Sequence, residues 1–447
     1  MRIVIAGGGT AGWLAALTLC KTRKDIDVTV IESSKIGIIG AGEGSTGLFT
    51  QFIRGDWFDT EIDIKEFVRE TNATVKMGIR HVNWTGDETS YFAPLDGSNT
   101  AYNIPDIDLC NALIDTPDEF HLASHGGQCH ELGADENHSY HFDAFLVGKY
   151  FSKIAIRNGV TIIDTEIDKV NVEDDSIKSL DLSNGDSIEA DLYIDCTGFK
   201  RILMNALGVG WKSYKRHLPV DSAIAFQMPI DPGYERVTTA HALKNGWVWK
   251  IPTSERFGCG YVYSSEFTTQ EDAEAEIKEH YGDVKILRKF EFNSGRSEEV
   301  WHTNCLSLGL AAAFSEPLEA TSIHTTIVQC MSFVYNHLFD TIEDTLQESS
   351  IQQYNKVSNE MYDDLMEFLV LHYMGGREDS DFWRYIKEGN IMTPQVKYML
   401  DKSKYAVPTW IDTRAYNGSP GTMLWNWILA GLGYIDGTTA SNTLERF

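Results

Sequence analysis

The sequence predicts an α/β protein: a doubly wound, Rossmann-like module, an inserted lobe of mixed sheet, and a helical C-terminal part. Three observations predict this class. Residues 2–6 are an apolar run followed by a glycine-rich turn, a helical pattern over 11–21 and a second apolar run at 27–31, the element order of a doubly wound fold. Aromatic and β-branched residues alternate over 220–265, as in antiparallel sheet. From 325 to about 400, Tyr, Leu and Phe recur at the i, i+3, i+4 spacing of helices.

The doubly wound module is expected to be discontinuous in sequence. Strand-like alternation returns at 159–171 and 187–195, and an apolar run at 304–314 leads into a Gly/Ala-rich turn. No internal repeat separates these segments. We expect the module at 1–47, 136–212 and 301–335, the sheet lobe at 48–135 and 213–300, and the helical lobe at 336–447.

Composition and charge restrict partners and location. The chain has 447 residues, with 38 Lys and Arg against 65 Asp and Glu, a formal net charge of -27. A surface of that sign repels phosphate backbones and anionic lipid head groups, so no nucleic acid or membrane partner is expected. No apolar run approaches the ~18 residues of a membrane span, and no signal-peptide pattern is present. The seven cysteines include no CxxC pair, which favours a cytoplasmic protein.

The glycine-rich turn has the spacing of a dinucleotide-binding site. Gly7, Gly9 and Gly12 form G-x-G-x-x-G between a predicted strand and a predicted helix. Such a turn lets the backbone approach a pyrophosphate, which the helix N-terminus also attracts. Glu32 ends the second strand, where its carboxylate can accept hydrogen bonds from an adenosine ribose. This context makes a chance match of the motif a poor explanation.

The motif alone does not distinguish FAD from the nicotinamide cofactors, which share it. Two further segments favour FAD: residues 40–46, Gly-Ala-Gly-Glu-Gly-Ser-Thr, and residues 195–198, Asp-Cys-Thr-Gly. FAD lies extended across its fold and needs such separated contacts. We therefore expect a flavoprotein.

Three other segments carry a more specific resemblance. Residues 247–252 read Trp-Val-Trp-Lys-Ile-Pro. Residues 309–323 read Gly-Leu-Ala-Ala-Ala-Phe-Ser-Glu-Pro-Leu-Glu-Ala-Thr-Ser-Ile, and residues 73–84 read Ala-Thr-Val-Lys-Met-Gly-Ile-Arg-His-Val-Asn-Trp. Together they resemble the flavin-dependent halogenases of the tryptophan-halogenase family. The resemblance covers nearly the whole chain and is strongest in the flavin module.

The resemblance implies a two-component enzyme. A separate NAD(P)H-dependent flavin reductase supplies FADH2, and O2 and halide then yield hypohalous acid, which passes through a tunnel to a small aromatic substrate. Lys76 and Glu319 match the family's essential lysine and glutamate. Thr321 and Ser322 match its halide site, and Trp247 and Trp249 match a gate between flavin and substrate. The matching cofactor-binding positions are Gly7, Gly8, Gly9, Thr10, Ala11, Gly12, Glu32, Ser33, Ile39, Glu43, Gly44, Ile167, Leu310 and Ile323.

The chemistry of these residues is compatible with those roles. The Lys76 ammonium can donate a hydrogen bond to hypohalous acid, whereas its neutral amine can form a haloamine; the sequence leaves the two open. Glu319 can polarise the halogen species or accept the ring proton. Considered without the family, Lys76 would be a solvated helix lysine, Glu319 an acid at a helix N-terminus, and the two tryptophans core side chains.

The chain departs from the family at the substrate site. Tryptophan-specific members hold the indole between a His-x-Phe pair and C-terminal aromatic residues, and bind the charged backbone of the amino acid with a long C-terminal extension. Here Ala93, Pro94 and Leu95 stand at the matching place, and the chain is short of that extension. We therefore expect indole- or phenol-type substrates other than free tryptophan, and bromide or iodide in preference to chloride. A homodimer is expected by analogy alone.

Two rival functions remain at this point: an FAD-dependent aromatic monooxygenase, and a flavin-binding homologue without catalytic activity. No metal is expected, because His121, His125 and His130 lack a fourth ligand nearby in the sequence. Near the C-terminus, Trp425, Trp427 and Tyr434 fit either the core or a pocket wall.

Overall fold

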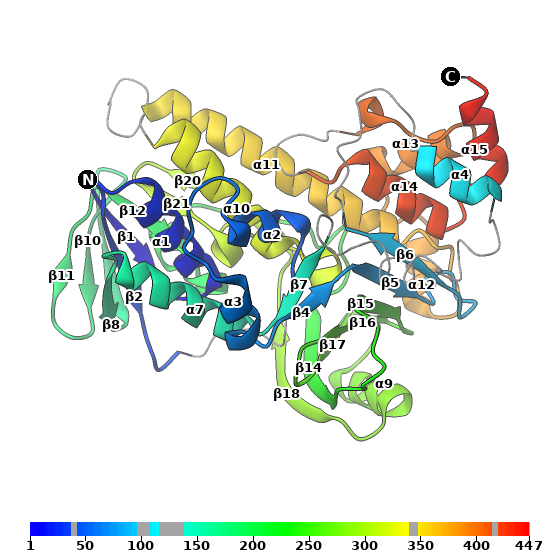
Figure 1. Cartoon of the computed structure of the whole chain (residues 1–447), viewed down its shortest axis with the longest axis horizontal. Coiled ribbons are helices and arrows are strands. Elements are labelled where there is room, and N and C mark those ends of the chain that lie inside the picture. The colour runs from blue at the N-terminus through cyan, green and yellow to red at the C-terminus, as the bar shows by residue number, and fades with distance from the viewer. Residues whose placement is uncertain (37–42, 96–106, 116–137, 339–346, 414–418, 447) are drawn as a thin grey trace.

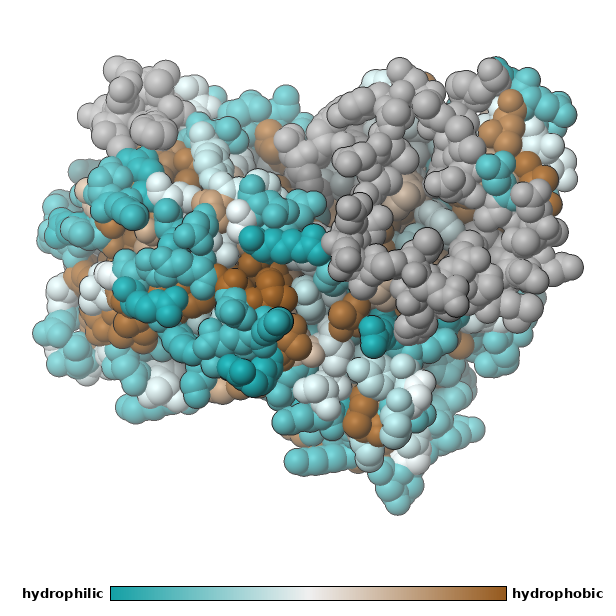
Figure 2. All heavy atoms as spheres, in the orientation of Figure 1, coloured by the Kyte–Doolittle hydropathy of each residue, from teal (hydrophilic) through white to brown (hydrophobic). Residues whose placement is uncertain are grey.

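The computed structural model describes residues 1–36, 43–95, 107–115, 138–338, 347–413 and 419–446. Figure 2 shows one face of the molecule, on which hydrophilic side chains predominate, in keeping with the net charge of -27. Within these ranges no helix combines the length and the apolar character needed to cross a membrane.

A six-stranded sheet forms the doubly wound part of the molecule (Figure 1). Its central strand, β1 (Arg2–Ala6), is buried from Ile3 to Ala6, as expected of a parallel strand covered on both faces. Strands β2 and β12 pair with it in parallel on either side. The order is β20 (Trp301–His302), β21 (Cys305–Ser307), β12 (Leu192–Asp195), β1, β2 (Asp27–Glu32) and β8 (Thr161–Asp164), with only the β20–β21 pair antiparallel.

Helix α1 (Thr10–Thr22) follows β1 directly and is buried over most of its length. It is apolar on all sides because it lies between the sheet and two further helices, α7 (Ala144–Arg157) and α10 (Thr321–Ser332). This packing fixes the N-terminus of α1 at the carboxyl end of the sheet, where ligands bind in doubly wound folds.

A seven-stranded sheet forms a second layer from two distant parts of the sequence. All neighbouring strands are antiparallel except β15 and β5, which pair in parallel and so join residues 78–94 to residues 222–291. The order is β18 (Lys285–Glu291), β14 (Ser222–Pro229), β17 (Arg256–Tyr263), β16 (Gly246–Pro252), β15 (Thr238–Ala242), β5 (Gly78–Val82) and β6 (Ser90–Pro94).

Three small sheets complete the strands. In one, β7 (Ser139–Phe142) pairs with both β3 (Glu43–Gly44) and β4 (Thr74–Lys76), which brings Gly44 and Lys76 to the same place. The others contain β9 (Ile167–Glu173), β10 (Ser176–Leu182) and β11 (Ser187–Ile188), and β13 (Trp211–Ser213), β19 (Gly295–Ser297) and β22 (Ala313–Phe314).

Helices make up the C-terminal part. Figure 1 shows α11 (Gln347–His372) running from the doubly wound part toward the C-terminal helices. Its two ends contribute to two separate apolar cores. The other helices are α12 (Asp381–Lys387), α13 (Pro394–Ser403), α14 (Thr422–Gly431) and α15 (Gly437–Leu444), with α2 (Gly47–Arg54), α3 (Ile64–Glu70), α4 (Ile107–Asp115), α8 (Ile202–Ala206) and α9 (Gln270–Tyr281) earlier in the chain.

The predicted fold class is confirmed. Strand β1 and the antiparallel sheet within residues 220–265 lie where the sequence predicted them, and α1 and β2 differ from prediction by a residue at an end. The region 304–314 differs more: it contains two short strands separated by a 3-10 turn, Gly309–Ala311. Gly309 has φ 59°, a left-handed conformation that ends β21 before the predicted strand is complete.

Candidate active site

The glycine-rich turn between β1 and α1 has no room for side chains on its inner side. A Cβ on Gly7 would lie 2.2 Å from the carbonyl oxygen of Cys196, and one on Gly12 would lie 1.9 Å from that of Gly7. A Cβ on Gly8 would meet Glu32 Oε2 at 1.8 Å, whereas Gly9 faces open space. The turn therefore presents bare backbone at the start of α1, as binding of a phosphate group requires.

Glu32 lies beside this turn at the end of β2. The indole N–H of Trp13 donates to its Oε2 over 3.0 Å, and burial raises the pKa of the carboxyl group. Of the other cofactor positions, Thr10 and Ala11 begin α1, and Ser33 directly follows β2. Ile167 lies on β9 and packs against the core beneath it, and Ile39 lies outside the described residues.

A largely apolar cavity of about 180 Å³ lies between the seven-stranded sheet and the start of α10. Aromatic side chains, including Phe199, Phe290 and Phe314, form much of its wall. Seven residues that the sequence assigned to the site share this cavity: Gly44, Lys76, Trp249, Leu310, Thr321, Ser322 and Ile323. Segments more than 200 residues apart in sequence therefore meet around one space. Glu43 pairs with Phe142 through its backbone next to this wall.

Lys76 ends β4 and is completely buried, so the alternative of a solvated helix lysine is wrong. Its Nζ donates to the carbonyl oxygen of Ser45 over 2.9 Å. Burial lowers the pKa of the ammonium group to about 8, against the opposing effect of the nearby Glu319 carboxylate. Near neutral pH the side chain is thus mostly a cation that loses its proton more readily than an ordinary lysine.

Thr321 and Ser322 are the first residues of α10. The preceding residue, Ala320, adopts a left-handed conformation with φ 53°, and its side chain does not cap the helix. The first N–H groups of α10 therefore receive no side-chain acceptor from the N-cap position, although such groups usually have one. Together with the helix dipole, they form an environment that favours a small anion.

Trp247 and Trp249 lie on the same side of β16, as their alternation predicts. Their ring centroids are 6.4 Å apart. Trp249 lines the cavity and covers Gly260, where a Cβ would lie 2.1 Å from the indole. Trp247 does not line the cavity and packs against Trp84. The pair forms an aromatic layer next to the cavity.

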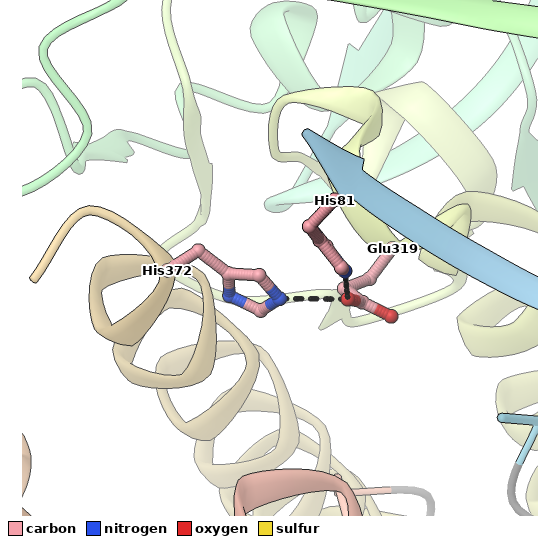
Figure 3. A group of neighbouring side chains, drawn as sticks. All are labelled: His81, Glu319 and His372. Carbon is pink, nitrogen blue, oxygen red and sulfur yellow. Dashed lines mark hydrogen bonds and ion pairs between the residues drawn. The ribbon is translucent and has the colours of Figure 1, made fainter. Parts of the chain in front are cut away.

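Glu319 ends the short 3-10 turn that precedes α10. Its carboxylate meets two histidines from other elements, as Figure 3 shows. His372 Nε2 lies 2.7 Å from Oε1, and His81 Nε2 lies 3.8 Å from the same oxygen. Burial, reinforced by the charges of His372 and Lys76, holds the pKa of His81 well below its ordinary value. Sequence reasoning missed both histidines, although His81 lies in the segment 73–84 that carried the resemblance.

A second carboxyl group, Glu316, is also buried at the cavity. Tyr373 donates its hydroxyl hydrogen to Oε1 over 2.7 Å. Burial raises the pKa of Glu316 to about 8, although Tyr373 and the indole N–H of Trp247 act against it. That N–H approaches without reaching hydrogen-bond geometry. Glu316 is therefore mostly protonated at neutral pH. The signal in the sequence was the Glu-Pro-Leu-Glu run that contains both carboxylates.

None of the three residues at the matching substrate position has an aromatic side chain. Ala93, on β6, is buried, and Pro94 and Leu95 are half-buried. Helix α14 packs directly on the same strand, since a Cβ on Gly431 would lie 2.2 Å from the Tyr91 ring. Trp425 and Trp427 belong to the apolar core beside α11. The His121, His125 and His130 cluster lies outside the described residues.

Comparisons with known proteins identify the family of this chain. A family model described as tryptophan halogenase matches residues 2–440. Tryptophan 7-halogenase RebH of Lentzea aerocolonigenes is 32% identical, over 97% of this chain and 90% of its own length. The 7-chloro-L-tryptophan 6-halogenase KtzR of Kutzneria sp. (strain 744) is 32% identical over 86% and 81%. Among solved structures, Tar14, a tryptophan C-6 flavin-dependent halogenase (chlorinase) from taromycin biosynthesis, has a TM-score of 0.87 at 30% identity, covering 100% of this chain and 95% of its own. The chain therefore belongs to the tryptophan halogenase family, a family of enzymes.

Proposed function

We propose that the protein is a flavin-dependent halogenase that acts on an electron-rich aromatic substrate through Lys76 and Glu319. The observation that carries this proposal is the cavity at which a buried lysine, an aromatic layer and an uncapped helix start meet. A structural lysine has no reason to be completely buried beside such a cavity, because burial of its charge is costly.

The glycine turn and Glu32 fit FAD. Backbone N–H groups at the start of α1 would bind the pyrophosphate, and Glu32, held by Trp13, would accept hydrogen bonds from the ribose. The apolar cavity, with Leu310 and Ile323 in its wall, suits a flat ring system. Reduced flavin and O2, when bound, would supply the oxidation that converts halide to hypohalous acid. A separate flavin reductase would provide the reduced flavin.

Lys76 would receive the hypohalous acid. A buried ammonium donates a stronger hydrogen bond than one in water, because the surrounding dielectric is low. With a pKa of about 8, the same side chain can also supply a fraction of neutral amine. The Ser45 carbonyl fixes Nζ in position in both forms. Trp247 and Trp249 would separate the flavin from the substrate, so that halogen reaches the substrate only past Lys76.

Glu319 would interact with the charged groups that take part in the reaction. Its carboxylate is near enough to raise the pKa of Lys76 and can therefore stabilise the ammonium or accept the proton that leaves the aromatic ring. The hydrogen bond from His372 would keep one oxygen fixed. Halide would bind at the N–H groups of Thr321 and Ser322.

The substrate is proposed to be an indole- or phenol-type compound other than free tryptophan. The relatives named above act on tryptophan or chlorotryptophan by their descriptions, which supports an indole ring. The small side chains at Ala93 and Pro94 argue against the same grip on a free amino acid. A preference for bromide or iodide stays part of the proposal, although Tar14 is described as a chlorinase.

Replacement of Lys76 tests the proposal. Lys76→Ala should abolish halogenation while flavin reoxidation by oxygen stays close to the wild-type rate, because the lysine acts after the halide has been oxidised. Glu319→Gln should keep FAD binding and slow halogenation by about 10²-fold or more. Lys149→Ala, at an exposed lysine, is the control and should behave as wild type. Halogenation that persists in Lys76→Ala would contradict the role proposed for Lys76, whereas NAD(P)H oxidation by the purified protein alone would favour the monooxygenase.

A further inference from the structure

Three potential metal ligands converge beside the cavity. His81 comes from β5, Glu319 from the turn before α10, and His372 from the last residue of α11. One ligand atom of each lies within 4.8 Å of the other two. Figure 3 shows both imidazoles directed at the Glu319 carboxylate from separate elements. Both histidines are completely buried, and the carboxylate is 11% exposed, so this is not a chance grouping of surface side chains.

The hydrogen bonds of His372 fix its tautomer. Nδ1 lies 2.9 Å from the carbonyl oxygen of Phe368, which can only accept, so Nδ1 carries a hydrogen. In the neutral ring, Nε2 then has a lone pair, and that lone pair faces Glu319 Oε1 at 2.7 Å. An ionised carboxylate is also only an acceptor. Two acceptors stay this close only with a cation between them, either a proton or a metal ion.

His81 lacks the partners that a buried imidazole needs. Among the residues that the structure describes, neither of its ring nitrogens has a hydrogen-bond partner. The ring is stacked on Tyr91, with centroids 4.7 Å apart and an interplanar angle of 15°, which holds Nε2 toward Glu319. A buried polar group without a partner destabilises the fold. An additional ligand at Nε2 would satisfy one of the two nitrogens and so reduce this cost.

We propose that His81, Glu319 and His372 form a binding site for a divalent transition metal of the zinc class. Two histidines and one glutamate are a known zinc ligand set, with a fourth position left for water. Bonds of about 2.0 Å in tetrahedral geometry place ligand atoms roughly 3.3 Å apart. The observed separations of 2.7 Å and 3.8 Å from Glu319 Oε1 lie on either side of that value, and all three ligand atoms lie within 4.8 Å of one another, so side-chain rotations would bring them around one metal ion. The bond from His372 Nδ1 to a backbone carbonyl is the orienting contact that metal-bound histidines usually have.

Metal binding would block turnover, an inference that rests on the proposed function. A bound cation occupies the carboxylate assigned to the reaction and repels the Lys76 ammonium beside it. The metal would replace the proton between His372 and Glu319, so that the metal-bound form and the active form exclude each other. The site is thus inhibitory.

Binding is tested on the untagged full chain, freed of metal with EDTA and dialysed. Titration calorimetry should show one Zn²⁺ per chain, and Co²⁺ should give the visible absorption of a nitrogen and oxygen site without a thiolate band. His81→Phe, which keeps the stack on Tyr91, and His372→Gln, which keeps a donor for Glu319, should each weaken Zn²⁺ binding at least about tenfold. Circular dichroism checks that both variants fold.

The control is His302→Gln. His302 lies near the surface between Glu299 and Asp175, a second histidine–carboxylate cluster among the described residues that could bind Zn²⁺. This variant should bind as wild type. Binding that persists in the folded His81→Phe and His372→Gln variants, binding lost in His302→Gln, or a thiolate band with Co²⁺ would overturn the proposed site.

The metal site and the proposed function can be overturned independently of each other. Zn²⁺ should inhibit wild-type halogenation and EDTA should restore it. An active halogenase that binds no Zn²⁺ would overturn the metal site and leave the proposed function intact. Stoichiometric Zn²⁺ binding by a protein that never halogenates would overturn the proposed function and leave the metal site intact. Stoichiometric binding without inhibition would contradict the inhibitory role.

Discussion

At the scale of single residues, burial of the Lys76 ammonium group should lower the stability of the folded protein by a measurable amount. Burial lowers its pKa from 10.5 to about 8, so the buried charge reduces the free energy of unfolding at every pH below about 8. This corresponds to about 3 kcal/mol, of which the bond to Ser45 offsets about 1 kcal/mol. We expect Lys76→Met to raise the free energy of unfolding at pH 7 by roughly 2 kcal/mol.

The direction in which stability changes with pH tests whether the buried charge of Lys76 causes this difference. Between pH 8 and 10.5 the unfolded chain holds a proton that the folded protein has lost, so wild-type stability rises relative to Lys76→Met across that window. Urea unfolding at pH 7 and pH 10 measures the difference. An equal difference in free energy of unfolding between the two proteins at both pH values would mean that packing, and not charge, causes the difference.

Glu316 should show the opposite dependence. Its pKa rises from 4.5 to about 8 on burial, so the folded protein retains a proton that the unfolded chain has lost, and stability falls as pH rises from 4.5 to 8. Glu316→Gln resembles the protonated acid and still accepts from Tyr373. We expect this variant to exceed wild type by roughly 3 kcal/mol at pH 7 and to match it near pH 4.5. Thermal melts across that range test it, and parallel curves would refute it.

At the scale of elements, the junction of β3, β4 and α10 positions Lys76. A Cβ on Gly44 would lie 3.2 Å from Lys76 Nζ, 3.3 Å from Thr238 Oγ1 and 3.6 Å from Ala320 Cβ. Gly44 does not have a positive φ, so alanine is tolerated by the backbone but displaces the ammonium. We expect Gly44→Ala to lower halogenation about tenfold or more, as small misplacements do, and to change stability little.

Gly233→Ala is the matched control, because its added methyl group meets only the Asp231 side chain at 3.7 Å in a surface turn. FAD titration of both variants confirms that the cofactor site is intact. Equal halogenation rates in the two variants would show that crowding at Nζ does not matter.

The elements around the site also show which of its features could be predicted from the sequence. The glycine turn, α1 and Glu32 lie within a few tens of residues of one another, and each follows from local spacing. Lys76 was identified by its motif, but its burial was not, because β4 pairs with β7 more than 60 residues away. The contact of Glu319 with His372 joins elements 53 residues apart. Long-range packing of this kind leaves no periodic signal in one sequence.

At the scale of the whole molecule, sheets built from distant segments and the C-terminal helices surround the site. The division into a flavin module, a sheet lobe and a helical lobe stays a prediction, as does the homodimer. Helix α14 packs directly on β6 at Gly431, and Ala93 on that strand contributes no aromatic ring. This packing bears on substrate choice.

We expect indole to be halogenated with a kcat/KM at least about tenfold higher than that of free tryptophan. Tenfold corresponds to about 1.4 kcal/mol, the upper end of the contribution of one aromatic stacking partner. Initial rates with bromide, FAD and a reductase, at matched substrate concentrations, measure the ratio. A higher kcat/KM for free tryptophan would show that other residues bind the amino acid.

The central claim is that this chain halogenates and does so through Lys76. The most direct measurement is mass spectrometry of indole after incubation with the purified protein, FAD, a generic flavin reductase, NADH and bromide. Wild type should give monobromoindole, and Lys76→Ala should give none while consuming O2 at a similar rate. Hydroxylated indole from wild type, or equal bromination by both proteins, would contradict the account.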